Sequence, residues 1–223
     1  MMKPASIIAP VITIDGPAGS GKGTIASLVA QKLAWHTLDS GALYRLTAYA
    51  ALQYNIASDN SDALAHIAKN LNVVFDAGEV YLDNEKVSLA IRQEACGNMA
   101  SKIAALAAVR KALLQRQRDF QQLPGLIADG RDMGTVVFPD AAIKIFLTAS
   151  AEERAKRRLN QLKQNKISAS LTRLIKEIEA RDARDMNRQS APLKAADDAV
   201  IIDSSCMTIA EVVDQVMLLT QRL

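Results

Sequence analysis

Short β-branched runs alternate with longer segments of helical periodicity along most of the chain. The first run, Val11–Asp15, leads through a glycine-rich segment to Ile25, Leu28, Val29 and Leu33, which recur at helical spacing. Further strand-like runs lie at residues 35–38, 126–128, 142–147 and 199–202, each flanked by helical patterns. The alternation predicts an α/β fold, a parallel sheet of about five strands flanked by helices.

The alternation breaks between Leu71 and Val87. Residues 72–75 and 80–82 are strand-like runs, and the sequence between them, Asp76-Ala77-Gly78-Glu79, is typical of a turn. Because a short loop cannot join parallel strands, two runs this close are expected to pair as an antiparallel hairpin. The hairpin is expected to belong to a small lobe inserted into the main unit.

Three later segments have the periodicity of helices. Residues 99–122 are rich in Ala and Leu and end before a Pro-Gly pair, which predicts one long helix. Residues 151–164 carry many Arg and Lys, and the polar residues 164–166 predict a helix end and a turn. Residues 170–189 predict a helix with one buried face. Its apolar stripe consists of Leu171, Leu174, Ile175 and Ile178.

The composition is that of an ordinary folded protein. Of 223 residues, 49% are apolar and 23% charged, and 27 Lys and Arg against 24 Asp and Glu leave a net charge of +3. These values exclude a disordered or collagen-like chain. So small a charge gives no argument for a nucleic-acid polymer as partner.

The apolar stretch at residues 7–14 is far shorter than the roughly 20 residues of a membrane span, and two distant cysteines fit a reducing compartment. We expect a cytoplasmic protein without a membrane partner.

A glycine-rich loop with a phosphate-binding motif follows the first predicted strand. The spacing G-x-x-x-x-G-K requires a strand before it and a helix after it, and both are predicted here. The glycines let successive backbone N–H groups turn toward an anion, and Lys22 reaches the β- and γ-phosphates, so the expected ligand is a polyphosphate. The loop consists of Gly16, Pro17, Ala18, Gly19, Ser20, Gly21, Lys22, Gly23 and Thr24.

Two residues are candidates for a magnesium site. Gly23 stands where a hydroxyl is expected after the lysine, so Thr24 is the candidate for the hydroxyl on the metal side. Asp129 follows the apolar run at residues 126–128, and its carboxylate suits Mg²⁺ or the water shell of the ion. An aspartate that caps the turn after the strand is the alternative interpretation of Asp129.

Arginines near predicted strand ends are candidates for binding phosphate. A planar guanidinium group pairs with phosphate oxygens two at a time and stabilises the charge of the transition state. Arg45 follows the second strand and Arg131 follows Asp129. Both are therefore expected at the carboxyl edge of the sheet, beside the glycine-rich loop.

Two predicted helices carry further charged candidates. Arg181, Asp185 and Arg188 share one helix face, which suits a sugar hydroxyl and a phosphate. The basic helix precedes the turn predicted at residues 164–166. A mobile flap in this region could bring the positive charge of the helix over a γ-phosphate. For both groups a solvated surface is the alternative. The candidates on the basic helix are Arg154, Arg157 and Arg158.

Several motifs together resemble one known family. The loop Gly-Pro-Ala-Gly-Ser-Gly-Lys-Gly-Thr has Gly-Thr after its lysine, as the nucleoside monophosphate kinases do. Beyond the loop, residues 38–45, 128–139 and 181–188 resemble the bacterial cytidylate kinases. The resemblance spans about residues 10–205 and implies a P-loop kinase in three parts. The implied parts are a core (1–40, 103–153 and 169–223), an acceptor-binding lobe with the hairpin (about 41–102) and a short lid (about 154–168).

The resemblance implies the reaction and its cofactor. ATP would donate its γ-phosphoryl group to CMP or dCMP, with Mg²⁺ as cofactor and with the loop and the arginines of the basic helix on the ATP side. Lys22, Arg131 and Arg188 would act on the phosphoryl groups. We expect the enzyme to be a monomer.

The resemblance also implies the contacts with CMP. Ser101, Arg110 and Asp132 would contact the cytosine, Arg181 and Asp185 the ribose, and Ser40, Arg45, Arg131 and Arg188 the acceptor phosphate. Asp132 can accept from the exocyclic amine of cytosine, and Arg110 can donate to N3 or O2. Uracil has a carbonyl in place of that amine. A charged hydrogen bond is worth roughly 1.5–3 kcal/mol, so UMP should be disfavoured by roughly tenfold or more.

Two other functions stay open on the sequence. The first is a kinase for another nucleoside monophosphate or a small metabolite. The second is a nucleotide-gated switch that binds partners. Residues 165–168 read Asn-Lys-Ile-Ser and lack the aspartate of the guanine-reading N-K-x-D element, which argues against the switch.

Overall fold

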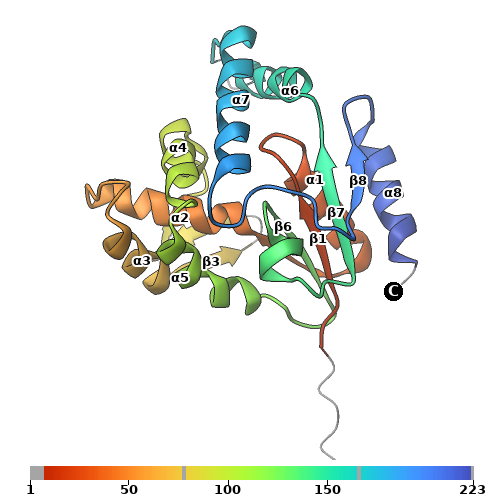
Figure 1. Cartoon of the computed structure of the whole chain (residues 1–223), viewed down its shortest axis with the longest axis horizontal. Coiled ribbons are helices and arrows are strands. Elements are labelled where there is room, and N and C mark those ends of the chain that lie inside the picture. Colours follow the sequence, from red (N-terminus) through yellow and green to blue (C-terminus); the bar gives the residue numbers. More distant parts are fainter. Residues whose placement is uncertain (1–7, 77–78, 165–166, 222–223) are drawn as a thin grey trace, which may run out of the picture.

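The fold is built on a parallel sheet of five strands. The computed structural model describes residues 8–76, 79–164 and 167–221, and Figure 1 shows the sheet at its centre. The strands lie in the order β2-β6-β1-β7-β8 and all neighbours are parallel, which confirms the predicted sheet. They are β1 (Val11–Asp15), β2 (His36–Asp39), β6 (Leu126–Gly130), β7 (Ile143–Thr148) and β8 (Val200–Asp203).

Helices cover both faces of the sheet, because successive side chains of each strand point to opposite faces. Ile12 and Ile127 belong to the core under α1 (Lys22–Leu33) and α8 (Ile209–Thr220). Val11 and Leu126 belong to the core on the other face. That face is covered by α2 (Ser40–Gln53), α3 (Ser61–Asn70), α4 (Glu94–Ile103) and α5 (Ala107–Arg118).

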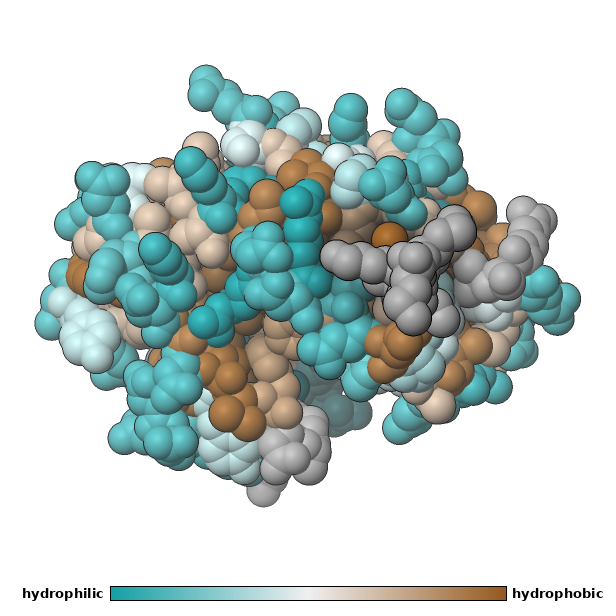
Figure 2. All heavy atoms as spheres, turned by 90° about the horizontal axis from the view of Figure 1, so that it is seen from below, coloured by the Kyte–Doolittle hydropathy of each residue, from teal (hydrophilic) through white to brown (hydrophobic). Residues whose placement is uncertain are grey.

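Polar and charged residues cover most of the surface in Figure 2, with apolar residues in separate patches.

A small antiparallel sheet forms part of the inserted segment. Its strands β3 (Val73–Asp76), β4 (Glu79–Leu82) and β5 (Glu85–Lys86) pair in that order, and a short turn η1 (Ala90–Arg92) precedes α4. The predicted hairpin is therefore confirmed. The third strand was not predicted, because two polar residues carry no strand pattern. The central residues of the predicted turn, 77 and 78, lie outside the described residues.

The single long helix predicted over residues 99–122 is wrong. The chain forms α4 and α5 instead, with a break at residues 104–106, and α5 ends at Arg118. Neither Gly nor Pro marks the break. Nη1 of Arg110 lies 3.4 Å from the carbonyl oxygen of Ala104, an oxygen that an unbroken helix would use in its own ladder. Because α4 packs on α2 and α5 packs on α3, tertiary contacts outweigh the local helix propensity here.

Two helices extend beyond the carboxyl edge of the sheet. Figure 1 shows α6 (Ala151–Gln164) at the top and α7 (Leu171–Asn187) descending beside it. Both predicted helices are confirmed, and Leu174 is the only buried member of the apolar stripe. The placement of Arg188 on the helix face is wrong, because α7 ends at Asn187 and Arg188 follows it in extended backbone. The predicted turn at 164–166 includes residues 165 and 166, which lie outside the described residues. Within the described part of the chain, no helix is long and apolar enough to cross a membrane.

Candidate active site

The glycine-rich loop connects the end of β1 to the start of α1, as predicted. Three of its glycines, Gly16 among them, have positive φ angles, a conformation that favours glycine. A Cβ on Gly16 would lie 2.0 Å from the carbonyl oxygen of Leu147, so the loop passes against β7 with no room for a side chain. Lys22 is buried, and its Nζ donates to the carbonyl of Pro17 at 2.9 Å. The lysine thus folds across the loop.

Lys22 lies among charges of both signs at the carboxyl edge of the sheet. Burial, followed by the charge of Arg131, lowers the pKa of Lys22 from 10.5 to about 7, and Asp129 and Asp15 oppose this shift. A polyphosphate beside the ammonium group would supply negative charge and favour its protonated form. The loop is therefore suited electrostatically to an anion.

Asp129 stands at the end of β6, next to the loop. The strand register pairs it with Ile14 of β1 and with Asp39 of β2. Its Oδ2 lies 3.2 Å from the position that a Cβ on Gly23 would take. Burial and the neighbouring Asp39 raise the pKa of Asp129 to about 7, so a cation at this carboxylate would favour its charged form. Thr24, the other metal candidate, is exposed in the first turn of α1.

Asp15 is a candidate that the sequence prediction missed. Its carboxylate accepts hydrogen bonds from the backbone N–H groups of Met133 and Gly134, each at 2.8 Å. Burial raises the pKa of Asp15 to about 6, although both hydrogen bonds favour the carboxylate. These N–H groups begin the π-helix η2 (Met133–Val137), directly after Arg131 and Asp132. Asp15 therefore ties the start of the phosphate loop to the segment that carries two predicted site residues.

The structure brings five of the predicted acceptor residues together in two ion-paired groups. Nε of Arg131 donates to Oδ2 of Asp185 at 3.0 Å. Arg110 forms a buried ion pair with Asp132, and Nη2 of Arg188 lies 3.7 Å from the second oxygen of the same carboxylate. Asp132 thus connects a residue predicted to contact the base with one predicted to contact the phosphate.

Two of the arginines predicted to bind the acceptor have no carboxylate partner among the described residues. Nε of Arg181 is buried without a hydrogen-bond partner in the described part of the chain. Burial, and then the charge of Arg131, lowers the pKa of Arg181 to about 10. Nη1 of Arg45 donates to the carbonyl of Ile91 at 2.8 Å, and burial lowers the pKa of Arg45. The edge therefore carries partly buried positive charge that suits an anionic ligand.

The two predicted serines lie in the same region with partners that the sequence did not indicate. Oγ of Ser40 donates to Oε1 of Gln117 at 2.6 Å. Oγ of Ser101 accepts from Nη1 of Arg184 at 2.9 Å. Gln117 lies 77 positions after Ser40, so no local spacing could reveal the first contact. The second partner, Arg184, lies inside the motif at residues 181–188 with two other arginines, and nothing in the motif distinguishes it as the partner of Ser101.

Arg154 does not project from the surface of α6. It is buried, and its Nη1 donates to the carbonyl of Ala18 at 3.0 Å. The same guanidinium group pairs with both oxygens of Asp182 on α7, at 3.1 and 2.5 Å. Arg154 therefore joins the phosphate loop to the helix that carries the predicted ribose contacts. Asp182 is a second residue that the sequence prediction missed.

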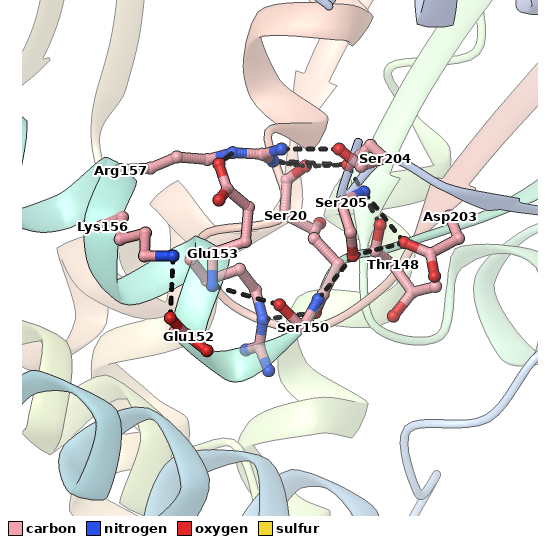
Figure 3. Close-up of polar contacts among 12 residues, drawn as sticks. Ser20, Thr148, Ser150, Glu152, Glu153, Lys156, Arg157, Asp203, Ser204 and Ser205 are labelled. Atoms are coloured by element: carbon pink, nitrogen blue, oxygen red, sulfur yellow. Dashed lines mark hydrogen bonds and ion pairs between the residues drawn. The ribbon is translucent and has the colours of Figure 1, made fainter. Parts of the chain in front are cut away.

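The other two arginines of the basic helix differ from each other. Figure 3 shows Arg157 reaching from α6 toward Ser20 and Ser204. Its Nη2 donates to the carbonyl of Ser204 at 2.7 Å, and its Nη1 lies 3.3 Å from the carbonyl oxygen of Ser20. Arg158 is exposed, and its Nη1 lies 3.5 Å from Oε1 of Gln161. The structure thus places Arg157 at the loop and Arg158 on the surface, and contact of either with ATP stays a prediction.

Comparison with known proteins decides the family of the chain. Residues 12–222 match the family model of cytidylate kinase. The chain belongs to the cytidylate kinase family. This result confirms the resemblance found in the motifs and the prediction of a nucleoside monophosphate kinase, and it favours a kinase over a nucleotide-gated switch.

Individual proteins support the same assignment. The cytidylate kinase of Aeromonas salmonicida is 58% identical over 214 residues, which are 94% of this chain and 93% of that protein. The cytidylate kinase of Nitrosococcus oceani is 58% identical over 214 residues, 93% of this chain and 94% of that protein. A solved structure of an uncharacterized protein from Eubacterium ventriosum matches with a TM-score of 0.50 and 12% identity, over 94% of this chain and 96% of that chain. That last likeness concerns the fold alone.

Removal of the Asp182 carboxylate tests the junction between the loop and α7. We expect Asp182→Ala to lower the free energy of unfolding by about 3–5 kcal/mol, because the buried Arg154 loses its charge partner. Urea denaturation followed by circular dichroism measures the change. The matched control is Glu177→Ala, which removes the partner of the exposed Arg173 on the same helix and should cost less than about 1 kcal/mol. Equal losses in the two variants would contradict the structural importance of the buried pair.

Proposed function

We propose that this enzyme transfers the γ-phosphoryl group of ATP to CMP or dCMP and so forms CDP or dCDP. The observation that carries the proposal is the cluster of partly buried arginines at the carboxyl edge of the sheet, next to the phosphate loop. Arg131 and Arg188 are held there by Asp185 and Asp132, while Arg181 keeps its Nε unpaired among the described residues. Two anions end to end, one on the loop and one on the arginines, fit this distribution of charge.

Alignment and electrostatic stabilisation account for the chemistry without a general base. Lys22 would contact the β- and γ-phosphates of ATP, and Arg131 and Arg188 would hold the acceptor phosphate in line with them. In phosphoryl transfer, positioning and charge neutralisation supply most of the rate enhancement. Burial strengthens these charge interactions, because the effective dielectric constant inside the site is lower than that of water.

Recognition of the acceptor nucleoside would rest on the second group of side chains. Asp132 would accept from the amine of cytosine, while Arg110, which already pairs with Asp132, would donate to N3 or O2. Ser101 would complete the contacts with the base. Arg181 and Asp185 would bind the ribose, and Ser40 and Arg45 would add contacts to the acceptor phosphate.

The residues at the loop fit a magnesium ion. Mg²⁺ is usually held by one or two carboxylates together with substrate phosphates and waters, and the buried Asp129 supplies such a carboxylate beside the loop. We propose that Asp129 and the hydroxyl of Thr24 hold the ion or its water shell. When bound, the ion would neutralise the charge that develops on the β- and γ-phosphates. Asp129 would orient it toward the loop.

Closure of the enzyme would exclude water from the transferred phosphoryl group. The segments proposed to move are the acceptor-binding lobe, about residues 41–102, and a lid at about residues 154–168. Binding of both nucleotides would drive this motion, so that ATP is not hydrolysed in the absence of an acceptor. We propose that the enzyme acts as a monomer.

An assay of ADP formation with four acceptors tests the proposed reaction. With CMP or dCMP, we expect ADP and the pyrimidine diphosphate to appear in equal amounts. With UMP, kcat/KM should be lower by roughly tenfold or more, since a carbonyl would face Asp132. Lys22→Ala is the control that should abolish transfer without abolishing CMP binding. Preference for AMP, or release of free phosphate in place of CDP, would contradict the proposal.

Asp132 can be tested separately as the reader of the base. We expect Asp132→Asn to reduce the ratio of kcat/KM for CMP over UMP by roughly tenfold, because the amide can donate to the uracil carbonyl. The ratio should change more than kcat with saturating CMP. Asp140→Asn, at an exposed aspartate a few residues further along, is the matched control and should leave the ratio unchanged. An unchanged ratio in a folded Asp132→Asn protein would exclude the role in base recognition.

A further inference from the structure

A large groove lies outside the proposed nucleotide site. It has a volume of about 1280 Å³ and is bordered by the edge strand β2, helices α3 and α5, and β3. Small-molecule sites usually range from about 300 to 1,000 Å³, so the groove can accommodate a ligand of nucleotide size. Helix α5 separates it from the active site. Arg110 and Gln117 of α5 contact Asp132 and Ser40 in the active site, whereas other positions of the same helix line the groove.

The groove carries an excess of positive charge. Lys69 of α3 and Lys111 and Arg116 of α5 line it. None of the three forms an ion pair with a residue that the structure describes. The acidic residue in the lining, Asp119, accepts a hydrogen bond from Nε2 of Gln115 at 2.8 Å. In the part of the lining that the structure describes, three cations against one carboxylate favour an anionic ligand with several charges.

Aromatic rings gather in the same groove, although aromatic residues make up only 4% of the chain. Trp35, the single tryptophan, lines it together with Phe75 and Phe120. The two phenylalanine rings pack edge to face with centroids 5.9 Å apart. The indole of Trp35 lies against Gly125, where an added Cβ would be 2.3 Å from the ring. Trp35 and Phe120 are partly exposed and Phe75 is exposed, so the groove offers aromatic surface on which a flat ring can stack.

We propose that this groove is a second nucleotide site, which binds a nucleoside triphosphate independently of catalysis. The base would stack on the aromatic side chains, and the phosphates would contact Lys69, Lys111 and Arg116. Both features are needed for this assignment. Cations alone would favour an inorganic polyanion, and aromatic rings alone would favour an uncharged apolar ligand. Proteins that bind single-stranded nucleic acid without reading the base by hydrogen bonds combine the same two features, and one nucleotide can use both contacts.

Fluorescence of the full-length protein tests the site, because Trp35 is the only tryptophan and lies in the groove. The active site is first filled with a bisubstrate analogue in which adenosine and cytidine are joined through phosphates. Calorimetry shows whether the analogue occupies the active site. Failure of the proposed function is thereby distinguished from failure of the second site. ATP is then titrated while tryptophan emission is followed. We expect a saturable change with one ATP per chain, weakened by added salt.

Variants of the groove complete the experiment. Lys111→Ala combined with Arg116→Ala should weaken the binding of ATP by roughly tenfold and leave turnover of CMP unchanged. The second variant, Lys69→Glu, changes a single exposed residue. It should also weaken the binding of ATP. Lys176→Ala, at an exposed lysine of α7, is the matched control and should have no effect. Circular dichroism verifies that each variant is folded.

Three outcomes would overturn the proposal. The first is an emission that ATP does not change, or that it changes equally in the wild-type protein and both groove variants. The second is tripolyphosphate binding as tightly as ATP, which would exclude stacking of the base. The third is a short single-stranded oligonucleotide binding more tightly than ATP, which would assign the groove to a nucleic acid.

Discussion

Buried carboxylates hold three of the arginines at the carboxyl edge of the sheet, and the proposed chemistry depends on these pairs. Asp132 lies between Arg110 and Arg188, and Asp185 holds Arg131. Ion pairs of this kind add little net stability, because removing both charges from water costs about as much as their attraction returns. Their benefit is geometric. The guanidinium groups are fixed before a phosphate arrives, so little reorganisation is left for the reaction itself.

The sheet and two bridging contacts connect the proposed donor and acceptor sites. Asp15 is the last residue of β1, at the start of the phosphate loop. Its carboxylate accepts hydrogen bonds from the backbone directly after Asp132. Arg154 binds the loop carbonyl of Ala18 and also Asp182 on α7. The loop is thereby tied to two segments that carry acceptor residues. Small displacements of the reacting groups lower the rate of phosphoryl transfer strongly. These positioning contacts therefore affect the rate directly.

Features with a local cause were predictable from the sequence, and features that rest on distant contacts were not. The sheet and the phosphate loop follow from strand patterns and glycine spacing, and the placement of Asp129 follows from the strand before it. The break at residues 104–106 has no local signal. Asp15 meets Met133 across 118 positions. The buried pair of Arg154 and Asp182 was also hidden, because a basic helix is more often a solvated surface.

A calorimetric comparison of CMP with cytidine tests the central claim most directly, since the two ligands differ only in the phosphate. If the arginine cluster binds that phosphate, CMP should bind at least roughly a hundredfold more tightly than cytidine, which equals about 2.7 kcal/mol. This difference in affinity should shrink as the salt concentration rises, because salt screens those arginine charges that are open to solvent. Equal affinities of CMP and cytidine would contradict the account, because the held arginines would then not serve as an acceptor phosphate site.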